Sequence, residues 1–363
     1  MLPAQWPPFS ELPLDKSGPP GNAWGLFGAN DQLGMLNHLT PEVVAAAATE
    51  IQTGIRVSLD WPLDRPSCPT DERRVFEHRI VHYADVPMND DEVHMNTQSS
   101  SQWDGFRHFG PYALVAYRSG RFYNGHVQAD FNDKSVLGID PRYLAQSHSA
   151  RLKHSIQMNP RTRDQNSAHD PNLSYVEWTQ NGGIIGRGIL IDYADWAKRN
   201  NQVLHPLESG RVRIQDIQTI IREQGIQIRT GDILFLRVGF TDAYNRLTEA
   251  EQRTYPSRQP GGLLGLEATS ESLRWLWESR FAAVAGDSPS FERAPLDGPF
   301  NGPDVSVHQW ALAGWGLPLG EMFDLEELSV VARGLGRYSF FLTSVPIKVP
   351  GGVASPPNAV AIF

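Results

Sequence analysis

Hydrophobic residues occur along the chain in short runs with two spacings, one typical of strands and one typical of helices. Apolar runs bordered by glycine or charged residues predict buried strands at residues 184–191, 233–238 and 282–285. Across residues 212–223 isoleucine returns every three or four positions, which predicts an amphipathic helix ended by Gly225. The isoleucines that share this helix face are Ile214, Ile217, Ile220 and Ile221.

Local signals predict the remaining elements. Thr40 is a favourable N-cap ahead of Pro41, so a helix is expected from there to Gly54. Another helix is expected after Asp304, which would cap it, and would end near Gly314. Further segments with helical or strand patterns are a helix at 267–279 and strands at 55–59, 77–83 and 337–349.

The alternation of helices and strands predicts one α/β domain. Several of the strands are short and flanked by glycine, which favours a mixed sheet covered by helices. Residues 1–22 are rich in proline and glycine and predict an extended arm, a candidate for packing on a partner subunit. The domain would occupy residues 23–363, with a polar surface insertion around 147–182.

Composition and charge restrict the class of partner. The chain has 363 residues, with 32 Lys and Arg against 41 Asp and Glu, a net charge of −9. This balance argues against a nucleic acid or an anionic membrane surface as partner. No run approaches the roughly 18 apolar residues of a membrane span, and the first residues do not resemble a signal peptide. The single cysteine, Cys68, lies among prolines without an evident activating group. A cytoplasmic protein without thiol chemistry is therefore expected.

The densest polar cluster lies between residues 94 and 110. Serines and Gly105 disfavour a helix there, and in an extended segment side chains of equal parity point to one face. Such a face would present a carboxylate between imidazoles, which suits acid–base chemistry or metal binding, although a polar surface loop stays the alternative. The residues of equal parity are His94, Gln98, Gln102, Asp104 and His108.

Two further candidates lie near the C-terminal part of the chain. His308 lies on the predicted helix after Asp304, and Glu321 follows it after a glycine-rich connection, so the two side chains can converge. The spacing alone is unspecific, and a histidine at the edge of the core with a solvated glutamate stays the alternative. Asp287 ends an apolar strand, where α/β sheets place functional groups, and it could equally cap the next turn. The chain has no Gly-x-Ser-x-Gly, Gly-x-Gly-x-x-Gly, P-loop, His-Glu-x-x-His or paired Cys-x-x-Cys motif.

The order of these segments resembles the cyclase and kynurenine formamidase-like family over nearly the full chain. That family includes isatin hydrolases and a fungal branch of cyclases, and the resemblance implies a swivelling β/β/α domain. The segments that carry it are Trp24-Gly25, Leu33 to Asn37, Gly186 to Asp192, Gly231 to Leu234, Asp287, His308, Glu321, Pro346 to Val349 and Ser355-Pro356.

The metal motif of that family, His-x-Gly-Thr-His-x-Asp-x-Pro-x-His, falls on residues 98–108 and is altered. Asp104 and His108 are kept, but Gln98 and Gln102 stand where the family has two metal-binding histidines. An amide oxygen is a weaker ligand than imidazole for zinc or manganese, so the first metal position should lose most of its affinity. Ser100, Ser101 and Phe106 replace the Gly, Thr and Pro of the motif.

The resemblance also implies roles for individual residues. A second metal position would use Asp104, His308 and Glu321, so at most one divalent ion, zinc or manganese, is expected, and a site without metal stays open. His108 would move the proton. The predicted catalytic residues are His108, Asp104, His308 and Glu321, and the predicted substrate-binding residues are Gln98, Gln102, Ser101, Trp103, Phe106 and Phe109.

Three functions are compatible with these residues. The first is an enzyme that hydrolyses an amide, ester or lactone of a small molecule, as a formamidase does. The second is a metal-independent cyclase, dehydratase or lactonising enzyme of secondary metabolism. The third is a catalytically inactive protein that binds a small ligand. The family is commonly dimeric or tetrameric, so a homodimer or homotetramer is expected, without a nucleic acid or membrane partner.

Overall fold

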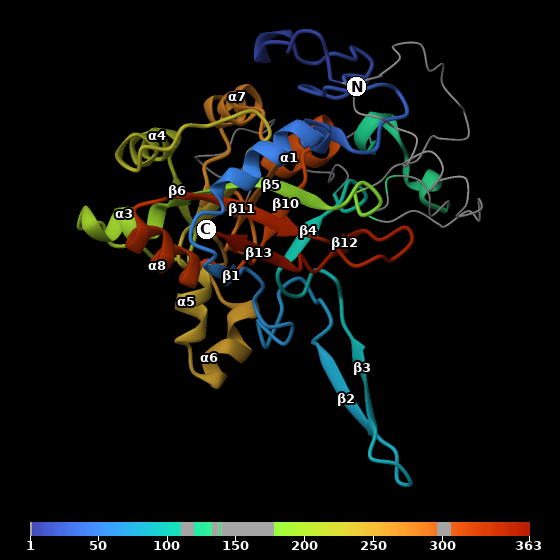
Figure 1. The fold of residues 1–363 in the computed structure, drawn as a ribbon, viewed down its shortest axis with the longest axis vertical. Helices are drawn as coiled ribbons and strands as arrows, with labels where there is room; N and C mark the ends of the chain where they lie inside the picture. The colour runs from blue at the N-terminus through green and yellow to red at the C-terminus, as the bar shows by residue number, and fades with distance from the viewer. Residues whose placement is uncertain (1, 110–119, 133–136, 138, 140–177, 296–305) are drawn as a thin grey trace.

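A nine-stranded mixed sheet forms the centre of the protein in the computed structural model (Figure 1). The structure describes residues 2–109, 120–132, 137, 139, 178–295 and 306–363. The strand order is β1-β13-β11-β5-β7-β9-β10-β4-β12. The strands are β1 (Arg56–Ser58), β4 (Gln102–Asp104), β5 (Ile184–Asp192), β7 (Ile233–Arg237), β9 (Ala283–Gly286), β10 (Leu319–Glu321), β11 (Ser339–Ser344), β12 (Ala354–Ser355) and β13 (Ala359–Ile362).

The middle of the sheet is parallel and its two sides are antiparallel. β5, β7, β9 and β10 run parallel to one another, whereas β11 and β13 on one side and β4 and β12 on the other run antiparallel to their neighbours. The parallel strands are almost fully buried, as expected for strands covered on both faces. The predicted α/β class with a mixed sheet is therefore confirmed.

Helices and two smaller sheets complete the described fold. α1 packs on β5, and α3 and α4 contact each other beside β7 and β5. The helices are α1 (Pro41–Ala47), α3 (Tyr193–Arg199), α4 (Ile214–Glu223), α5 (Phe240–Asn245), α6 (Glu249–Thr254), α7 (Ser270–Ser279) and α8 (Glu326–Leu335). The small sheets pair β2 (Glu77–His82) with β3 (Asn89–His94) and β6 (Gly210–Val212) with β8 (Leu264–Leu266).

Most predicted elements are present, with shorter bounds. Thr40 caps α1 by accepting from the Val43 amide, but the α-helix ends at Ala47 and continues as one 3₁₀ turn. The strand predicted at 337–349 ends at Ser344, because Pro346 cannot continue a ladder. The predicted insertion lies outside the described residues up to residue 177, as does the predicted cap Asp304.

The helix that carries the candidate His308 has an unusual form. After His308 the chain winds as a π-helix over Gln309–Trp315, all of it buried. π-helical turns are rare and occur often at functional sites. No helix in the described part of the chain is both long enough and apolar enough to cross a membrane.

The N-terminal arm packs on its own chain. The Trp6 ring lies 4.5 Å from the ring of Trp277 and 5.1 Å from that of His38. The indole N–H groups of Trp277 and Trp315 donate to the carbonyls of Pro7 and Gly21. The arm thus covers α7 and the π-helix, and its packing on a partner stays a prediction.

His38 under this arm predicts a loss of stability in acid. Its buried ring has no hydrogen-bond partner among the described residues, and burial, aided by Arg280, lowers its pKa to about 4. The folded state therefore resists protonation of His38. The stability that depends on a neutral His38 is fully present above pH 6.5 and is lost as the pH falls from there towards 4. The loss should reach about 3 kcal/mol.

We expect His38→Leu to flatten the fall in the free energy of unfolding between pH 7.5 and pH 5, measured by urea denaturation. Substitution of the exposed His205 by Gln is the matched control and should leave the slope unchanged. An equal pH dependence in His38→Leu and wild type would contradict this assignment.

Candidate active site

The candidate site lies where β4 and β10 pair. Their antiparallel register places Gln102 opposite Glu321 and Asp104 opposite Leu319. Because side chains alternate along a strand, Gln102, Asp104 and Glu321 share one face of this pair. All three are at most 2% exposed, so two carboxylates lie side by side almost without water.

Two amides bridge these carboxylates. The Gln98 side-chain N–H donates to Asp104 Oδ1 over 2.9 Å. The Gln102 side-chain N–H donates to Glu321 Oε2 over 2.9 Å and lies 3.5 Å from Asp104 Oδ2. The glutamines that stand at the family's metal-binding positions thus supply neutral donors to the carboxylates. Among the described residues, Gln102 Oε1 is buried without a hydrogen-bond partner.

His308 enters the site between two glutamates. Its Nδ1 lies 2.6 Å from Glu292 Oε2, and its backbone N–H donates to Glu292 Oε1 over 3.0 Å. Its Nε2 lies 3.0 Å from Glu321 Oε1. Burial opposes charge on the ring, but the two carboxylates outweigh it and raise the pKa of His308 well above its usual value. The ring is therefore an imidazolium held from both sides.

The two glutamates respond differently to this cation. Burial alone would raise the pKa of Glu292, but the His308 charge and hydrogen bonds lower it. Burial raises the pKa of Glu321 to about 7, and the nearby Asp104 adds to this while His308 opposes it. Glu292 thus stays ionised at neutral pH, whereas Glu321 changes its protonation state near neutral pH.

Glu292 is a functional residue that the sequence did not reveal. It is fully buried, and Ser306 donates to it as well. It lies 16 positions before His308, and no short motif connects them. Only the folded chain shows that this acid orients the histidine.

His108 is the partly exposed residue of the site. Its side chain is 17% exposed, and its Nε2 lies 3.8 Å from Asp104 Oδ2. Gln98 contacts its other ring nitrogen, Nδ1. Burial lowers the pKa of His108, although Asp104 opposes this, so the ring is neutral at neutral pH. A neutral imidazole at the mouth of a charged site can accept a proton.

The structure does not place every predicted substrate-binding residue at the site. Trp103 is fully buried on the other face of β4, where its indole N–H donates to Ser344 Oγ over 2.9 Å. Phe106 is also buried and packs on Tyr123 and Trp178. The expected pocket wall from Trp103 and Phe106 is therefore absent, because strand alternation and the following turn direct both rings into the core.

Phe109 lies beside the site, whereas the Ser101 hydroxyl is bonded to the backbone. The Phe109 ring lies 5.4 Å from the His308 ring and is the one predicted aromatic residue beside the site. Ser101 Oγ donates to the Met322 carbonyl over 2.6 Å and accepts from the Trp61 amide over 2.7 Å. Both hydroxyl functions are thus used within the protein, so Ser101 braces the chain beside Glu321 instead of facing a substrate.

The backbone after Glu321 is held in a rare conformation. Met322 has a φ of 54°, which a side chain other than glycine seldom adopts. Its carbonyl accepts from Ser101, and its amide donates to the Ser288 carbonyl over 3.1 Å. Because strained residues persist only when their surroundings fix them, this turn has the character of a functional segment.

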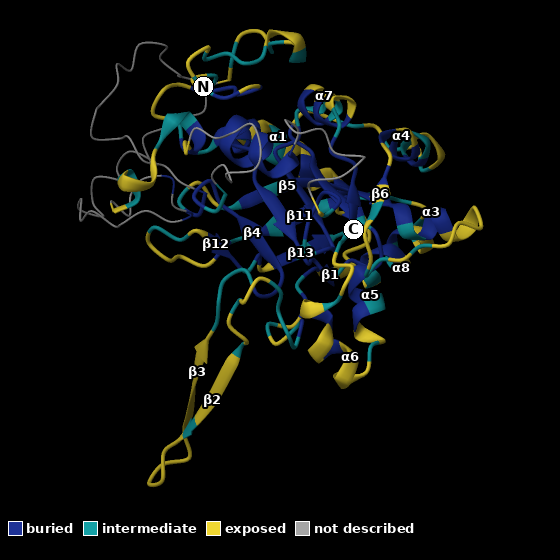
Figure 2. Ribbon diagram, turned by 180° about the vertical axis from the view of Figure 1, so that it is seen from behind, coloured by how far each residue is buried: buried dark blue, intermediate teal, exposed yellow. Residues whose placement is uncertain are grey.

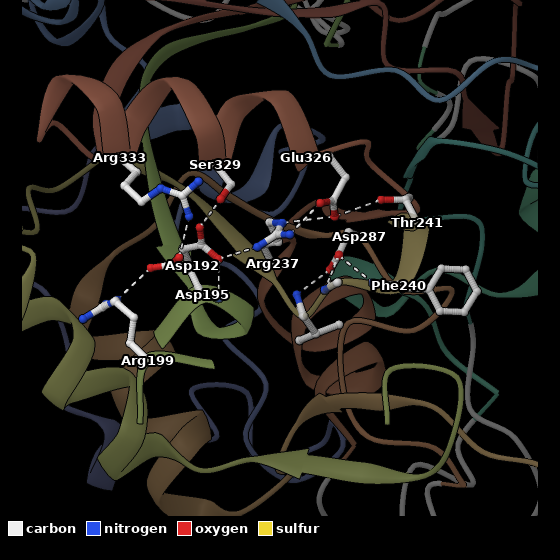
Figure 3. Close-up of polar contacts among 12 residues, drawn as sticks. Asp192, Asp195, Arg199, Arg237, Phe240, Thr241, Asp287, Glu326, Ser329 and Arg333 are labelled. Atoms are coloured by element: carbon white, nitrogen blue, oxygen red, sulfur yellow. Dashed lines mark hydrogen bonds and ion pairs between the residues drawn. The ribbon is translucent and has the colours of Figure 1, made fainter. Parts of the chain in front are cut away.

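His94 and Asp287 do not belong to the site. The chain turns between β3 and β4, so His94 lies exposed at the end of β3 and contacts Arg74. The expectation of one extended face is therefore correct only for Gln102 and Asp104. Gln98 and His108 lie in the turns on either side of β4, from which their side chains reach Asp104. Asp287 accepts from the amides of Val238, Gly239 and Phe240 over 2.7, 2.7 and 2.9 Å, so it secures the turn that leads into α5 (Figure 3).

A charged network beside Asp287 fixes the ends of the parallel strands (Figure 3). Arg237 at the end of β7 donates to Asp192 at the end of β5 over 2.8 Å and to Glu326 of α8 over 3.1 Å. Ser329 also donates to Asp192, and Arg333 donates to Asp195 over 2.6 Å. These pairs connect the carboxyl ends of β5 and β7 to α3 and α8.

The buried donor set fits one divalent ion. Ligand atoms of Asp104, His308 and Glu321 lie within 4.8 Å of one another. Among the described residues Glu321 Oε1 accepts no hydrogen bond of good geometry, although His308 Nε2 lies 3.0 Å from it, so this is the oxygen that a cation could take. Two carboxylates and an imidazole suit zinc or manganese. An ion would have to displace the proton from His308 Nε2.

Comparison with known proteins agrees with the fold and places the chain in a family. The family model described as "Putative cyclase" matches residues 55–293, so the chain belongs to the cyclase family. A solved structure described as a novel cyclase is 27% identical, with a TM-score of 0.71, over 94% of this chain and 99% of the other.

Two isatin hydrolase structures share the fold at lower identity. Isatin hydrolase A from Ralstonia solanacearum is 14% identical, with a TM-score of 0.52, over 89% of this chain and 97% of its own. Isatin hydrolase A from Labrenzia aggregata, bound to benzyl benzoate, is 14% identical, with a TM-score of 0.52, over 90% of this chain and 98% of its own. No curated protein matches the chain.

Glu292→Gln tests whether the buried ion pair carries this site. Glutamine keeps an oxygen acceptor for His308 Nδ1 but removes the charge, so we expect a loss of about 2 kcal/mol in the free energy of unfolding. Urea denaturation at pH 7 measures it. The exposed Glu271→Gln is the matched control, and a loss for Glu292→Gln no larger than for this control would contradict the assignment.

Proposed function

We propose that this protein is an enzyme that uses acid–base chemistry at a carbonyl of a small molecule, with hydrolysis of an amide, ester or lactone as its reaction. The observation that carries the proposal is a pair of histidines in two different environments within one group of buried acids. His308 lies buried between Glu292 and Glu321, and His108 is a partly exposed imidazole 3.8 Å from Asp104. A site that holds both a base and fixed charges suits acyl chemistry.

His108 supplies the proton transfer. As a base it takes the proton of a water molecule that attacks the substrate carbonyl, and Asp104 stabilises the resulting imidazolium. When the tetrahedral intermediate collapses, His108 returns this proton to the leaving nitrogen or oxygen. His108 thus ends the two steps in the protonation state in which it began. Because its pKa is lowered, the ring is neutral and able to accept the first proton, and it releases that proton readily in the second step.

The remaining groups orient and polarise the substrate. The amide of Gln98 lies between Asp104 and His108, where it can turn to donate to a carbonyl oxygen. Phe109 is the apolar contact beside His308. A divalent ion held by Asp104, His308 and Glu321 would supply Lewis acidity towards the same carbonyl. Membership of the cyclase family and the hydrolases among the similar folds support this proposal.

A metal-independent cyclase, dehydratase or lactonising enzyme is the second candidate. The observation that favours it is that the Gln98 and Gln102 side chains donate to Asp104 and Glu321, so one oxygen of each acid already has an amide donor in place of a metal ion. The same His108 would then remove a proton next to a carbonyl or from an attacking hydroxyl. A protein that only binds a small ligand is the third candidate. The retention of Asp104, His108, His308 and Glu321 together argues against it.

His108→Ala should lower kcat/KM by about 10²- to 10⁴-fold, because the base is removed while the buried charges stay. The measurement is hydrolysis of a panel of aryl formamides, aryl esters and lactones, with circular dichroism to verify the fold. His205→Ala is the control for loss of an exposed histidine. Full activity of His108→Ala would overturn the proposed mechanism.

Metal analysis of the purified protein separates the first two candidates. One ion per chain and activity that chelation removes and zinc or manganese restores would support hydrolysis at a loaded site. Turnover that survives chelation, with ring closure or loss of water as the product, would support the second candidate. Saturable ligand binding without turnover of any substrate in the panel would support the third.

A further inference from the structure

A segment near the N-terminus has no part in the site described so far, although it contacts the helix that follows His308. Residues 21–35 include Trp24-Gly25 and the start of Leu33 to Asn37, two stretches that carry the family resemblance. This segment packs on the π-helix, Gln309–Trp315, which begins directly after His308. Its contacts therefore bear on the position of a residue of the site.

Two carbonyls near the end of the π-helix accept hydrogen bonds from this segment. Trp24 Nε1 donates to the Ala313 carbonyl over 2.8 Å. The Ala23 amide donates to the Gly314 carbonyl over 2.9 Å. All residues of the π-helix are buried, as are most strands of the central sheet, which are dark blue in Figure 2. A carbonyl without a donor is costly in such surroundings, so these contacts matter to the helix.

The Ala313 carbonyl finds its donor outside the helix. In a π-helix its partner would be the amide five residues on, but Pro318 stands there and has no N–H. The Leu317 amide, four residues on, donates to the Ala311 carbonyl over 2.8 Å instead. The indole N–H of Trp24 is therefore the group that satisfies this buried carbonyl.

An ordinary α-helical turn would satisfy the same carbonyl in another way. The Leu317 amide would then leave the Ala311 carbonyl and donate to that of Ala313, four residues before it. Because Trp24 supplies a donor from outside, the helix gains less from this exchange, and the π form is favoured. The indole thus acts on the choice between two helical registers as well as on packing.

Two glycines allow the segment to come close enough for these contacts. Gly21 and Gly34 have φ angles of 75° and 54°, in the left-handed region. A Cβ on Gly21 would lie 1.9 Å from the Trp310 ring. A Cβ on Gly34 would lie 1.9 Å from the Gly316 carbonyl oxygen. The Gly21 carbonyl also accepts from the Trp315 indole over 2.9 Å, so segment and helix are in direct backbone contact.

His308 depends on the register of this helix because it lies in the turn where the helix begins. The Trp310 amide donates to the Ser306 carbonyl over 3.1 Å, so the turn that contains His308 continues into the π-helix. The His308 ring reaches Glu292 and Glu321 at 2.6 and 3.0 Å. Each residue of an α-helix turns by about 100°, so a change of one residue in register would rotate the ring away from both acids.

We propose that Trp24 is a positioning residue. Its indole N–H holds the helix after His308 in the π form and thereby keeps the imidazole between Glu292 and Glu321. Trp24 acts through the helix and does not touch the reacting atoms. Its effect on the His308 ring is independent of the reaction, and only its effect on turnover rests on the proposed function.

Trp24→Phe tests the proposal, because phenylalanine keeps an aromatic ring but lacks the donor. The readout is proton NMR of the hydrogen on His308 Nδ1, identified by its absence in His308→Gln. The 2.6 Å contact with Glu292 moves this signal far downfield and protects the hydrogen from exchange with water. In Trp24→Phe we expect the signal to shift and its exchange to become about tenfold faster.

Trp196→Phe is the matched control. Trp196 on α3 is 6% exposed, as is Trp24, but its indole N–H has no hydrogen-bond partner among the described residues. The same loss of volume should therefore leave the His308 signal as in the wild type. An unchanged signal in folded Trp24→Phe, or an equal change in Trp196→Phe, would overturn the proposal.

Turnover gives a second readout. On a substrate that the wild type hydrolyses, Trp24→Phe should lower kcat about tenfold and leave KM within about twofold, because the substrate contacts remain. If the wild type hydrolyses no substrate, the proposed function fails and the NMR signal alone decides on Trp24. If circular dichroism shows that Trp24→Phe does not fold, Trp315→Phe takes its place, since it removes the donor to the Gly21 carbonyl and should shift the His308 signal likewise.

Discussion

The imidazole of His308, held between two buried carboxylates, is the interaction on which the site depends. Glu292 binds it on one side and Glu321 on the other, at 2.6 and 3.0 Å. Carboxylates without water are costly unless a charge and hydrogen bonds compensate them. The His308 cation provides the charge, and the amides of Gln98 and Gln102 provide donors to Asp104 and Glu321. Burial lowers the pKa of His108 against the opposing effect of Asp104, so this ring remains neutral at neutral pH.

The sheet creates this arrangement from distant parts of the chain. The β4–β10 pair brings Gln102 against Glu321, and the left-handed turn at Met322, braced by Ser101 and Ser288, holds Glu321 in place. Asp287 and Arg237 then secure the neighbouring strand ends. The site is thus supported by the backbone pairing of β4 and β10, two strands of the sheet that forms the core.

The resemblance to the cyclase family implied that His308 and Glu321 meet Asp104 at one site. Sequence patterns predicted the α/β class and the buried strands. Patterns of period two and 3.6 carry that information where an element is long and one-sided, as in β5 and α4. They failed where a turn interrupts the pattern. Trp103 and Ser101 seemed to belong with their polar neighbours, but strand alternation buries one and a backbone contact occupies the other. Glu292 could not be found, because its role arises from a contact across 16 residues without a motif.

The most direct test of this account is the protonation state of the two histidines. Nitrogen-15 NMR of chelator-treated protein with labelled histidine, assigned with His308→Gln and His108→Gln variants, reports the charge on each ring at pH 7. The account predicts an imidazolium at His308, with both ring nitrogens protonated, and a neutral ring at His108. A neutral His308 together with a charged His108 would contradict it, because the buried carboxylates would then lack their compensating charge.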